Sequence, residues 1–416
     1  MSIIGQFLNN VIVKGTIQIT HPDGSSEVFG TSAAGYPDVG IRLADKNVVR
    51  QILLDPRLGA AETFMDGRLI VEQGDIMELV QLLRANRPFE RGGKLNEPGA
   101  FKKMRDRFAG SLDRINFLGR SKSNVAHHYD IGNDLYDLFL DEDLQYSCAY
   151  WDFERHGSEI TLEQAQADKK AHIAAKLDLN SGQRVLDIGC GWGGMALYLH
   201  RKTGVEVLGI TLSEEQLKKA RERAEEEGVG DKVKFELIDY RELAARDAGA
   251  FDRIVSVGMF EHVGTPQFRT FFRSCANLMT DDGVMLLHTI GRMGSPGTTD
   301  AFTRKYIFPG GYIPALSEAL AASEPYRLIA TDIENLRLHY AHTLREWYKR
   351  TEINRDKIIA LYNERFYRMW IFYLAGATAA FESGGMCNYQ IQFSRSRRTL
   401  PITRDYIAAT EKSLIA

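Results

Sequence analysis

Glycines crowd a short segment near the middle of the 416-residue chain, where a strand is expected to run into a helix. The strand, residues 185–188, is built mostly from β-branched and aliphatic residues, which is typical of a strand covered on both faces. Gly189, Gly191 and Gly193 then allow a tight turn that brings a ligand close to bare backbone amides at the helix start. Asp187 places a carboxylate beside this turn. The segment therefore predicts a site for a nucleotide-like ligand.

The glycine spacing alone does not identify the ligand, because Gly189, Gly191 and Gly194 also fit the dinucleotide-binding pattern. A dinucleotide fold places an acidic residue about 20 residues further on, at the end of the next strand, where it holds the ribose. Here the strand at 205–210 is followed by Thr-Leu-Ser at 211–213. The order Asp-x-Gly-x-Gly-x-Gly resembles motif I of class I S-adenosylmethionine (SAM) methyltransferases. We therefore expect SAM, with NAD and a turn that binds no ligand as alternatives.

The elements that would position this turn alternate along the second part of the chain. Alternation of helix and strand predicts an α/β fold, a mostly parallel doubly wound sheet with its ligand at the strand ends. Residues 259–264 and 288–291 follow strand ends, so we expect them to face the ligand. The expected helices are 162–177, 212–227 and 268–278, and the expected strands are 184–188, 205–210, 233–237, 251–257 and 284–289.

The beginning of the chain has a different pattern. Residues 3–12 carry apolar side chains at helical spacing, and 15–20 and 26–29 flank a His-Pro-Asp-Gly turn that indicates a hairpin. We interpret 1–90 as a smaller α+β domain that associates with lipid or membrane, which a basic connector at 91–122 joins to the rest. The opening helix either packs on the core of this domain or lies in a lipid interface.

The net charge of −3 conceals a strongly basic segment. From Arg84 to Lys122 there are eleven Lys or Arg against four acidic residues, a net charge of +7, so the rest of the chain carries about −10. Such a segment is either a solvated linker or a surface for anionic membranes, to which each basic residue contributes roughly 1 kcal/mol. Because no nucleic-acid-binding motif accompanies the charge, we expect no nucleic-acid partner.

The four cysteines show no paired metal-ligand spacing. They predict reduced thiols in a cytoplasmic protein and no metal. No apolar run approaches the roughly 18 residues that a membrane span needs. The beginning of the chain lacks the basic leader and the cleavage site of a signal peptide.

Further segments carry chemistry-bearing residues in a specific order. Together with the glycine turn, they resemble the cyclopropane-fatty-acyl-phospholipid synthase family, which is related to the mycolic acid cyclopropane synthases. The resemblance covers about 120–400 and implies that 123–416 form a catalytic domain with the class I SAM-dependent methyltransferase fold, a Rossmann-like doubly wound sheet. The segments are Val-Ala-His-His-Tyr-Asp-Ile-Gly-Asn-Asp-Leu-Tyr at 125–136, Tyr-Ser-Cys-Ala-Tyr-Trp at 146–151, Phe-Glu-His-Val-Gly at 260–264 and Leu-His-Tyr-Ala-His-Thr-Leu-Arg-Glu-Trp at 338–347.

The resemblance implies transfer of the SAM methyl carbon to the cis double bond of an unsaturated phospholipid acyl chain. A carbocation results, a base removes a methyl proton, and the cyclopropane ring closes. Because an alkene is a poor nucleophile, orientation is valuable and can contribute roughly 7–11 kcal/mol. Aromatic faces and a dry pocket suit the cation. The aromatic candidates are Tyr129, Tyr146, Trp151, Tyr340 and Trp347.

The resemblance also implies which residues hold the base, a bicarbonate ion. They are Cys148, Glu261, His288, Tyr340 and the backbone of Ile290. We expect Glu261 to accept the hydrogen of bicarbonate, because two neighbouring anions repel unless they share a proton. Taken singly, Glu261 is explained as an anion at a helix N-terminus, His288 as a hydrogen-bonded core histidine and Tyr340 as packing. Their joint occurrence favours a site.

For SAM, the resemblance implies a larger set of residues. Asp239, Tyr240 and Arg241 fall beside the adenine, and Gln216 suits the ribose hydroxyls, which have no acidic partner here. The full set is Tyr146, Ser147, Asp187, Gly189, Gly191, Gly193, Thr211, Leu212, Gln216, Asp239 and Tyr240.

The sequence departs from the family at Ala377, where many members carry a cysteine in a Tyr-Leu-x-x-Cys-Ala stretch. A reaction without a covalent intermediate needs no thiol there, and Cys387 lies ten residues further on. The resemblance also implies a homodimer in the cytoplasm, associated peripherally with the inner membrane surface. The alternatives are methylation or methylenation of the acyl chain by the same fold, a small-molecule SAM methyltransferase, and a lipid-binding protein without activity.

Overall fold

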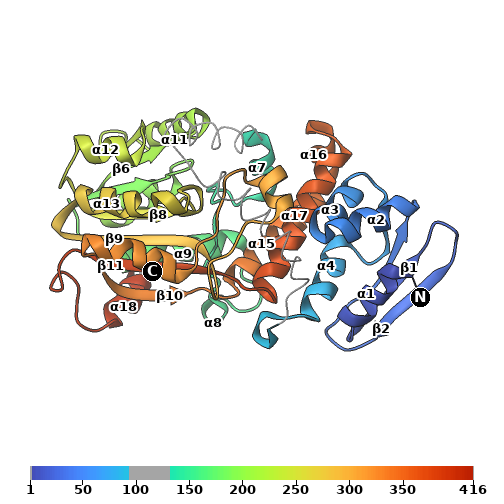
Figure 1. Cartoon of the computed structure of the whole chain (residues 1–416). Helices are drawn as coiled ribbons and strands as arrows, with labels where there is room; N and C mark the ends of the chain where they lie inside the picture. The colour runs from blue at the N-terminus through green and yellow to red at the C-terminus, as the bar shows by residue number, and fades with distance from the viewer. Residues whose placement is uncertain (1, 93–131, 416) are drawn as a thin grey trace. The chain divides into compact units, whose positions relative to one another are not determined.

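The computed structural model describes residues 2–92 and 132–415, which form two compact units (Figure 1). The first unit contains 2–92, Thr299–Pro309 and Ala341–Met386. The second contains 132–298, Gly310–Tyr340 and 387–415. The sequence pattern did not indicate that two later segments join the N-terminal residues. Nearly all of the basic connector, and Tyr129 with the first part of its motif, lie outside the described residues, so the predicted domain boundaries stay a prediction.

The first unit is built on a four-stranded sheet with the order β2-β1-β3-β4. β1 and β2 form the predicted antiparallel hairpin, β1 pairs in parallel with β3, and β3 pairs antiparallel with β4. Helix α17 packs against α3 and α4, and a hydrogen bond of 2.9 Å from Gln81 Nε2 to Glu382 Oε2 links α4 to the end of α17. The elements are α1 (Ile3–Val11), β1 (Gly15–Thr20), β2 (Ser26–Thr31), β3 (Asp38–Leu43), α2 (Lys46–Leu54), α3 (Pro56–Met65), β4 (Leu69–Gln73), α4 (Ile76–Ala85), η1 (Phe89–Arg91), the π-helical turn η4 (Thr303–Ile307), α16 (Arg355–Leu361) and α17 (Glu364–Glu382), with most of α15 (His339–Ile353).

The opening helix belongs to the core of this unit. Leu8, Val11 and Ile12 are buried, and α1 packs against β2. The side chain of Ser2 caps the helix by accepting a hydrogen bond of 3.1 Å from the backbone of Gly5. Of the two readings of 3–12, packing on the domain core is therefore the one that the structure confirms. The alternative, that this helix lies in a lipid interface, is not supported, because these apolar side chains are covered by protein.

The second unit is built on a seven-stranded sheet with the order β10-β11-β9-β8-β5-β6-β7. The pairs β9–β8, β8–β5, β5–β6 and β6–β7 are parallel, which confirms the predicted doubly wound sheet. β10 and β11 pair antiparallel at one edge, and the sequence pattern did not predict them. The strands are β5 (Arg184–Ile188), β6 (Glu206–Thr211), β7 (Val233–Leu237), β8 (Phe251–Val257), β9 (Met279–Arg292), β10 (Ile329–Asn335) and β11 (Met386–Ser394).

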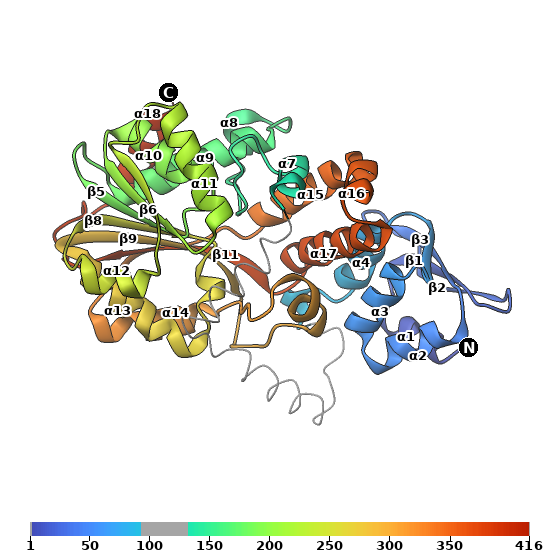
Figure 2. The same ribbon diagram turned by 90° about the horizontal axis from the view of Figure 1, so that it is seen from above.

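Helices cover both faces of this sheet, as Figure 2 shows, with α9, α10, α11 and α18 on one face and α12, α13 and α14 on the other. Each face has its own buried apolar core. Helix α11 begins at Glu214, two residues later than predicted, because the side chain of Ser213 accepts the backbone N–H of Gln216 and caps it. The helices are α7 (Asn133–Phe139), α8 (Phe153–His156), α9 (Leu162–Leu177), α10 (Gly194–Thr203), α11 (Glu214–Glu226), α12 (Tyr240–Arg246), η2 (Phe260–His262), η3 (Thr265–Gln267), α13 (Phe268–Leu278), α14 (Leu316–Ser323), η5 (Glu324–Tyr326) and α18 (Asp405–Ile415).

None of the helices in 2–92 and 132–415 has the length and hydropathy of a membrane span. The same residues hold no group of three or more His, Cys, Asp or Glu side chains placed to bind a metal ion.

Candidate active site

The carboxyl ends of three neighbouring parallel strands bring most of the predicted residues to one edge of the sheet. The glycine turn follows β5, Glu261 follows β8, and His288 lies near the end of β9. The pairing of Ile188 with Ser256 and of Val257 with His288 sets these ends level with one another. This edge is where a doubly wound sheet binds its ligand.

The glycine turn has one open side. Gly189, Gly191 and Gly193 have φ values of 83°, 54° and 85°, a region that other residues rarely adopt. A Cβ added to Gly189 would lie 2.9 Å from Met259 Cβ, and one added to Gly193 would lie 2.8 Å from Phe235 Cζ. A Cβ added to Gly191 would meet no described heavy atom within 4 Å. The turn is thus packed against the protein on two sides and leaves space for a ligand at Gly191.

Asp187 is a buried carboxylate beside this turn. Its Oδ2 has no hydrogen-bond partner among the described residues. Burial raises the pKa of Asp187 to about 7, and the nearby Lys169 ammonium opposes this rise. A buried polar atom normally has a partner, so this oxygen is available to a polar group of a ligand.

The other predicted SAM residues after β6 and β7 already have protein partners. Thr211 Oγ1 donates a hydrogen bond of 2.9 Å to Gln216 Oε1, and Leu212 between them is half-buried. Asp239 Oδ1 accepts from the backbone N–H and from Nε of Arg241, and Asp239 Oδ2 pairs with Arg241 Nη2 at 2.7 Å. A ligand that contacts Asp239 would have to share it with this guanidinium, which also lies 5.3 Å from the ring centre of Tyr240.

The predicted segment 146–148 reaches the same edge from a loop before α9. A Cβ added to Gly258, directly after β8, would lie 3.9 Å from Ser147 Cβ. The Tyr146 ring packs edge-on to Tyr136 with 5.2 Å between the ring centres. Burial raises the pKa of the Cys148 thiol above its usual range, and the thiol donates to the Ala149 carbonyl at 3.4 Å. Cys148 therefore stays a thiol and can act as a weak hydrogen-bond donor.

Glu261 is the second buried carboxylate of the site. Its Oε1 accepts the backbone N–H of Ile290 at 2.5 Å, which ties η2 to the end of β9. Its Oε2 has no hydrogen-bond partner within the part of the chain that the structure describes. Burial raises the pKa of Glu261 to about 7, although its own backbone N–H, the Ile290 N–H and the Thr289 hydroxyl oppose the rise. Near neutral pH the carboxyl group can therefore exist in both protonation states.

His288 is buried between two amides of β11. The distance from His288 Nε2 to Asn388 Nδ2 is 2.6 Å, and from His288 Nδ1 to Gln390 Nε2 it is 3.2 Å. Burial lowers the pKa of His288 well below its usual value, so the ring is neutral and has one donor and one acceptor. Because Gln390 Oε1 has no partner among the described residues, a flipped Gln390 amide would satisfy the ring N–H as well.

Tyr340 comes to this edge through the turn that precedes α15. Leu336 N donates to Asn388 O at 2.8 Å, and His339 N donates to Leu336 O at 2.9 Å. This turn is therefore next to the residue that contacts His288, and Tyr340, which is buried, follows directly. The backbone N–H of Trp151 donates to His339 Nδ1 at 2.8 Å, which brings a further aromatic candidate to the same turn.

Trp347 and Ala377 are in the first unit, on α15 and α17. Cys387, at the start of β11, is buried, which raises the pKa of its thiol to about 11 and makes a nucleophilic role unfavourable near neutral pH.

Sequence reasoning missed several polar residues that support the site. Asn388 and Gln390 contact His288, and the buried Lys169 contacts the 145–147 segment from α9. The alternation of polar residues at 388, 390 and 392 was an available signal, because alternate positions of a strand share one face.

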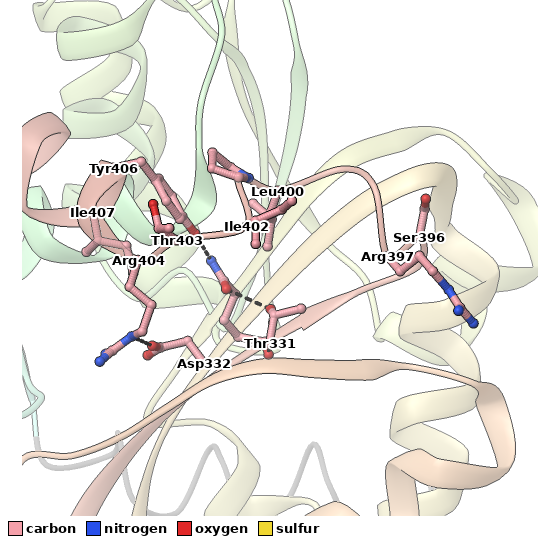
Figure 3. Close-up of a pocket in the computed structure, with 12 residues that line it drawn as sticks. Thr331, Asp332, Ser396, Arg397, Leu400, Ile402, Thr403, Arg404, Tyr406 and Ile407 are labelled. Carbon is pink, nitrogen blue, oxygen red and sulfur yellow. Dashed lines mark hydrogen bonds and ion pairs between the residues drawn. The ribbon is translucent and has the colours of Figure 1, made fainter.

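A separate pocket of about 260 Å³ lies at the other end of β11 (Figure 3). It is lined by Gln392, Arg404, Tyr406 and neighbouring residues, and none of the predicted site residues contributes to it. The hydrogen bond of 2.9 Å from Arg395 N to Gly283 O places this end of β11 beside the first half of β9, away from His288. The pocket is therefore at the opposite edge of the sheet from the candidate site.

Comparisons relate the chain to known proteins. Residues 118–391 match the family model described as mycolic acid cyclopropane synthetase. The chain is 38% identical to the cyclopropane-fatty-acyl-phospholipid synthase of Escherichia coli K12 over 88% of this chain and 90% of that protein. It is 41% identical to a probable fatty acid methyltransferase of Pseudomonas putida, over 68% of this chain and 72% of that protein. The chain is 33% identical to the solved structure of mycolic acid cyclopropane synthase CmaA1 complexed with SAH and CTAB, with a TM-score of 0.61. The match covers 66% of this chain and 98% of the CmaA1 chain.

Proposed function

The chain belongs to the mycolic acid cyclopropane synthetase family, and we propose that it transfers the methyl carbon of SAM to cis double bonds of unsaturated phospholipid acyl chains and closes cyclopropane rings. The observation that carries this proposal is the buried Glu261. One of its oxygens is fixed by the Ile290 N–H and the other is unpartnered among the described residues. An alkene has no acidic proton before methyl transfer, so the site needs a proton acceptor only after the new bond has formed.

We place SAM at the glycine turn. The open side of Gly191 and the unpartnered Oδ2 of Asp187 support this assignment, because they leave space and an acceptor at a helix start. The remaining proposed contacts are Tyr146, Ser147, Gly189, Gly193, Thr211, Leu212, Gln216, Asp239 and Tyr240.

We further propose that bicarbonate is held by Cys148, Glu261, His288, Tyr340 and the Ile290 N–H. Support comes from the chemistry of this set, since a thiol, a phenol and a backbone amide donate hydrogen bonds and Glu261 Oε2 can accept one. The Ile290 N–H and both His288 nitrogens have protein partners, so an anion would have to share or replace these contacts. When bound, bicarbonate supplies a proton acceptor. The role of Glu261 is to orient it and to hold the hydrogen between two anions.

The residues of the chain provide orientation and exclude water. SAM supplies the electrophilic methyl carbon, and the electron pair of the broken carbon–sulfur bond stays on sulfur. The alkene π pair forms the new carbon–carbon bond, and the electron pair of the lost methyl C–H bond closes the ring. Tyr146, Trp151 and Tyr340 are buried or half-buried aromatic residues near this edge, and their faces would favour the intermediate cation.

We also propose that the enzyme works as a homodimer in the cytoplasm, bound peripherally to the inner membrane surface through the basic segment 84–122. The charge of that segment is the observation that supports contact with anionic lipid. A membrane contact would give the site access to acyl chains without a membrane span.

The decisive experiment identifies the lipid product. The purified protein is incubated with SAM and vesicles of a dioleoyl phospholipid, and the extracted lipid is examined by proton NMR. We expect upfield cyclopropane methylene signals, and none with vesicles of saturated lipid. Omission of dissolved carbonate should slow the reaction, and its return should restore the rate; a rate independent of carbonate would remove bicarbonate from the mechanism.

A second function has one specific observation in its favour. The Pseudomonas putida relative is called a probable fatty acid methyltransferase, so the same site could end its reaction at a methyl or methylene branch. The NMR experiment separates the two, because a branch gives methyl or exomethylene signals in place of the upfield ones. Unmodified lipid would contradict both functions.

A further inference from the structure

Lys169 is the most deeply buried cation of the second unit near the site, and it lies on α9. Its side chain is fully buried, and its ammonium donates hydrogen bonds to Gln145 Oε1 at 2.5 Å and to Ser147 Oγ at 2.9 Å. Burying an ammonium group costs several kcal/mol unless it is paired and hydrogen-bonded. The structure thus keeps an unfavourable group in contact with Ser147, a proposed SAM residue, and with Gln145, which directly precedes the 146–148 segment; this calls for an explanation.

Helix α9 holds this segment by its backbone as well. Gln166, three residues before Lys169 on the same helix, donates from Nε2 to Gln145 O at 3.1 Å and to Ser147 O at 3.0 Å. The two α9 side chains together make four hydrogen bonds to residues 145 and 147. Cys148 follows directly, so its position is fixed by the same contacts.

The network continues to the glycine turn. Gln145 Nε2 donates to Asp143 Oδ2 at 3.1 Å, and Asp143 forms an ion pair with Arg223 of α11. Arg223 Nη1 donates to the carbonyl of Trp192, which lies between Gly191 and Gly193, at 2.9 Å. A Cβ added to Gly194 would lie 2.4 Å from Gln145 Nε2, so the loop also rests directly on the start of α10.

We propose that Lys169 is a positioning residue that preorganises the SAM pocket. Its hydrogen bond to Ser147 fixes Ser147 and the adjacent Cys148. Its hydrogen bond to Gln145 stabilises the glycine turn through Asp143 and Arg223. This inference rests on the proposed function. It goes beyond that function because Lys169 touches neither the methyl donor nor the lipid and acts through Ser147.

The electrostatics agree with this role. Burial lowers the pKa of Lys169 to about 7, and the carboxylates of Asp141 and Asp143 oppose this, whereas the neighbouring Lys170 adds to it. Lys169 in turn favours the ionised form of Asp187 on β5. Replacement of a buried ion by a well-packed apolar side chain is often neutral or stabilising, so packing alone does not explain a lysine at this position.

The test compares two buried lysines of α9. Lys169→Met removes the ammonium under the site. Lys176→Met removes another buried ammonium on the same helix, one that pairs with Asp332 at 3.4 Å and with Glu334. S-adenosylhomocysteine (SAH) is titrated into each variant by calorimetry, and thermal unfolding is recorded alongside. We expect Lys169→Met to raise the Kd for SAH and the KM for SAM by on the order of tenfold, which is the loss of a hydrogen bond to a charged group. We expect Lys176→Met to leave both within about twofold, whatever its stability.

Two further variants keep the test independent of folding losses. Lys169→Gln retains a donor without the charge and should restore most of the SAH affinity. The double variant with Ser147→Ala should show non-additive effects, because both substitutions break the same hydrogen bond.

The outcomes separate this inference from the function on which it rests. Unchanged SAH affinity in Lys169→Met, an equal loss in Lys176→Met, or additive effects in the double variant would each overturn the positioning role while the proposed function stands. A wild-type protein that does not bind SAH would overturn both.

Discussion

Replacement of Glu261 by Gln should remove a pH-dependent loss of stability. Burial raises the pKa of Glu261 from 4.5 to about 7. At about 1.4 kcal/mol for each tenfold change in an ionisation constant, ionisation is about 3 kcal/mol less favourable in the folded state than in the unfolded state. The stability that protonated Glu261 gives the folded state is fully present below pH 4.5, where the group is protonated in both states. It is lost as the pH rises from 4.5 through about 7.

Glutamine is nearly isosteric and cannot ionise. Its side-chain oxygen can still accept the Ile290 N–H, so the contact that ties η2 to β9 is kept. The free energy of unfolding of wild type minus that of Glu261→Gln should therefore fall by about 3 kcal/mol between about pH 4.5 and pH 8. Urea unfolding at several pH values measures this difference, in which the other titrating groups cancel. The same substitution at Glu215, which is exposed on α11, is the control and should give a difference that changes little with pH.

The same variant tests the chemistry. The amide replaces the unpartnered Oε2 with a donor, so turnover should fall on the order of 10²-fold or more, the range expected for a group that handles a proton. SAH affinity should stay within about twofold, because the glycine turn is not altered. If the difference in unfolding free energy between wild type and Glu261→Gln is the same at all pH values, Glu261 does not have a raised pKa in the folded state. An equal loss of SAH affinity and turnover in Glu261→Gln would refute a role of Glu261 in the reaction that is separate from SAM binding.

The remaining predictions concern the SAM turn and the basic segment. Asp187→Ala should abolish measurable SAH binding by calorimetry while circular dichroism shows a folded protein; unchanged affinity would remove Asp187 from the site. Gly193→Ala should lower the thermal unfolding midpoint, because its Cβ would lie 2.8 Å from the Phe235 ring. Gly191→Ala should mainly weaken SAH binding, because its Cβ enters open space. A larger loss of stability in Gly191→Ala and a larger loss of SAH affinity in Gly193→Ala would contradict the assigned ligand position. Charge reversal in the basic segment should reduce partition to anionic vesicles and activity on bilayers, while activity on detergent-dispersed lipid survives. If the charge-reversed variant partitions like wild type at low salt, the segment is only a solvated linker. The reversed residues are Lys102, Lys103, Arg105 and Arg107.

The order of the central elements could be predicted because it depends on local periodicity. Strands β5 to β8 alternate with helices, each of which covers one face of a parallel sheet. The extent of β9 could not be predicted in the same way. It begins at Met279, five residues before the predicted start, because Met279 pairs with Phe251 of β8. The polar Asp281 and Asp282 within this extension hide the strand from a hydrophobic pattern.

A buried helix over 369–381 could be predicted from its apolar run, but the placement of the later segments escaped prediction because their environment is set by distant residues. Helix α17 joins the first unit through contacts with α3 and α4, which lie about 300 residues earlier, as the bond between Gln81 and Glu382 illustrates. Strand β11 buries Asn388 and Gln390, which read as surface residues until His288 is placed between them. Motifs identify the groups that face a ligand, whereas the groups that support them follow only from the folded chain.

The two buried carboxylates of the site share a feature that neither motif nor composition reveals. Asp187 and Glu261 each keep one oxygen without a hydrogen bond among the described residues, and burial raises both pKa values to about 7. A stable protein would ordinarily satisfy such atoms, since each costs about 1–3 kcal/mol. The environments differ: the Lys169 ammonium lies near Asp187, whereas the groups that oppose the rise for Glu261 are hydrogen-bond donors, namely its own backbone N–H, the Ile290 N–H and the Thr289 hydroxyl. Near pH 7 both carboxyl groups can therefore exist in both protonation states, and of the two, Asp187 is the one beside a cation. This arrangement supports our proposal that a sulfonium donor and a base bind at neighbouring strand ends.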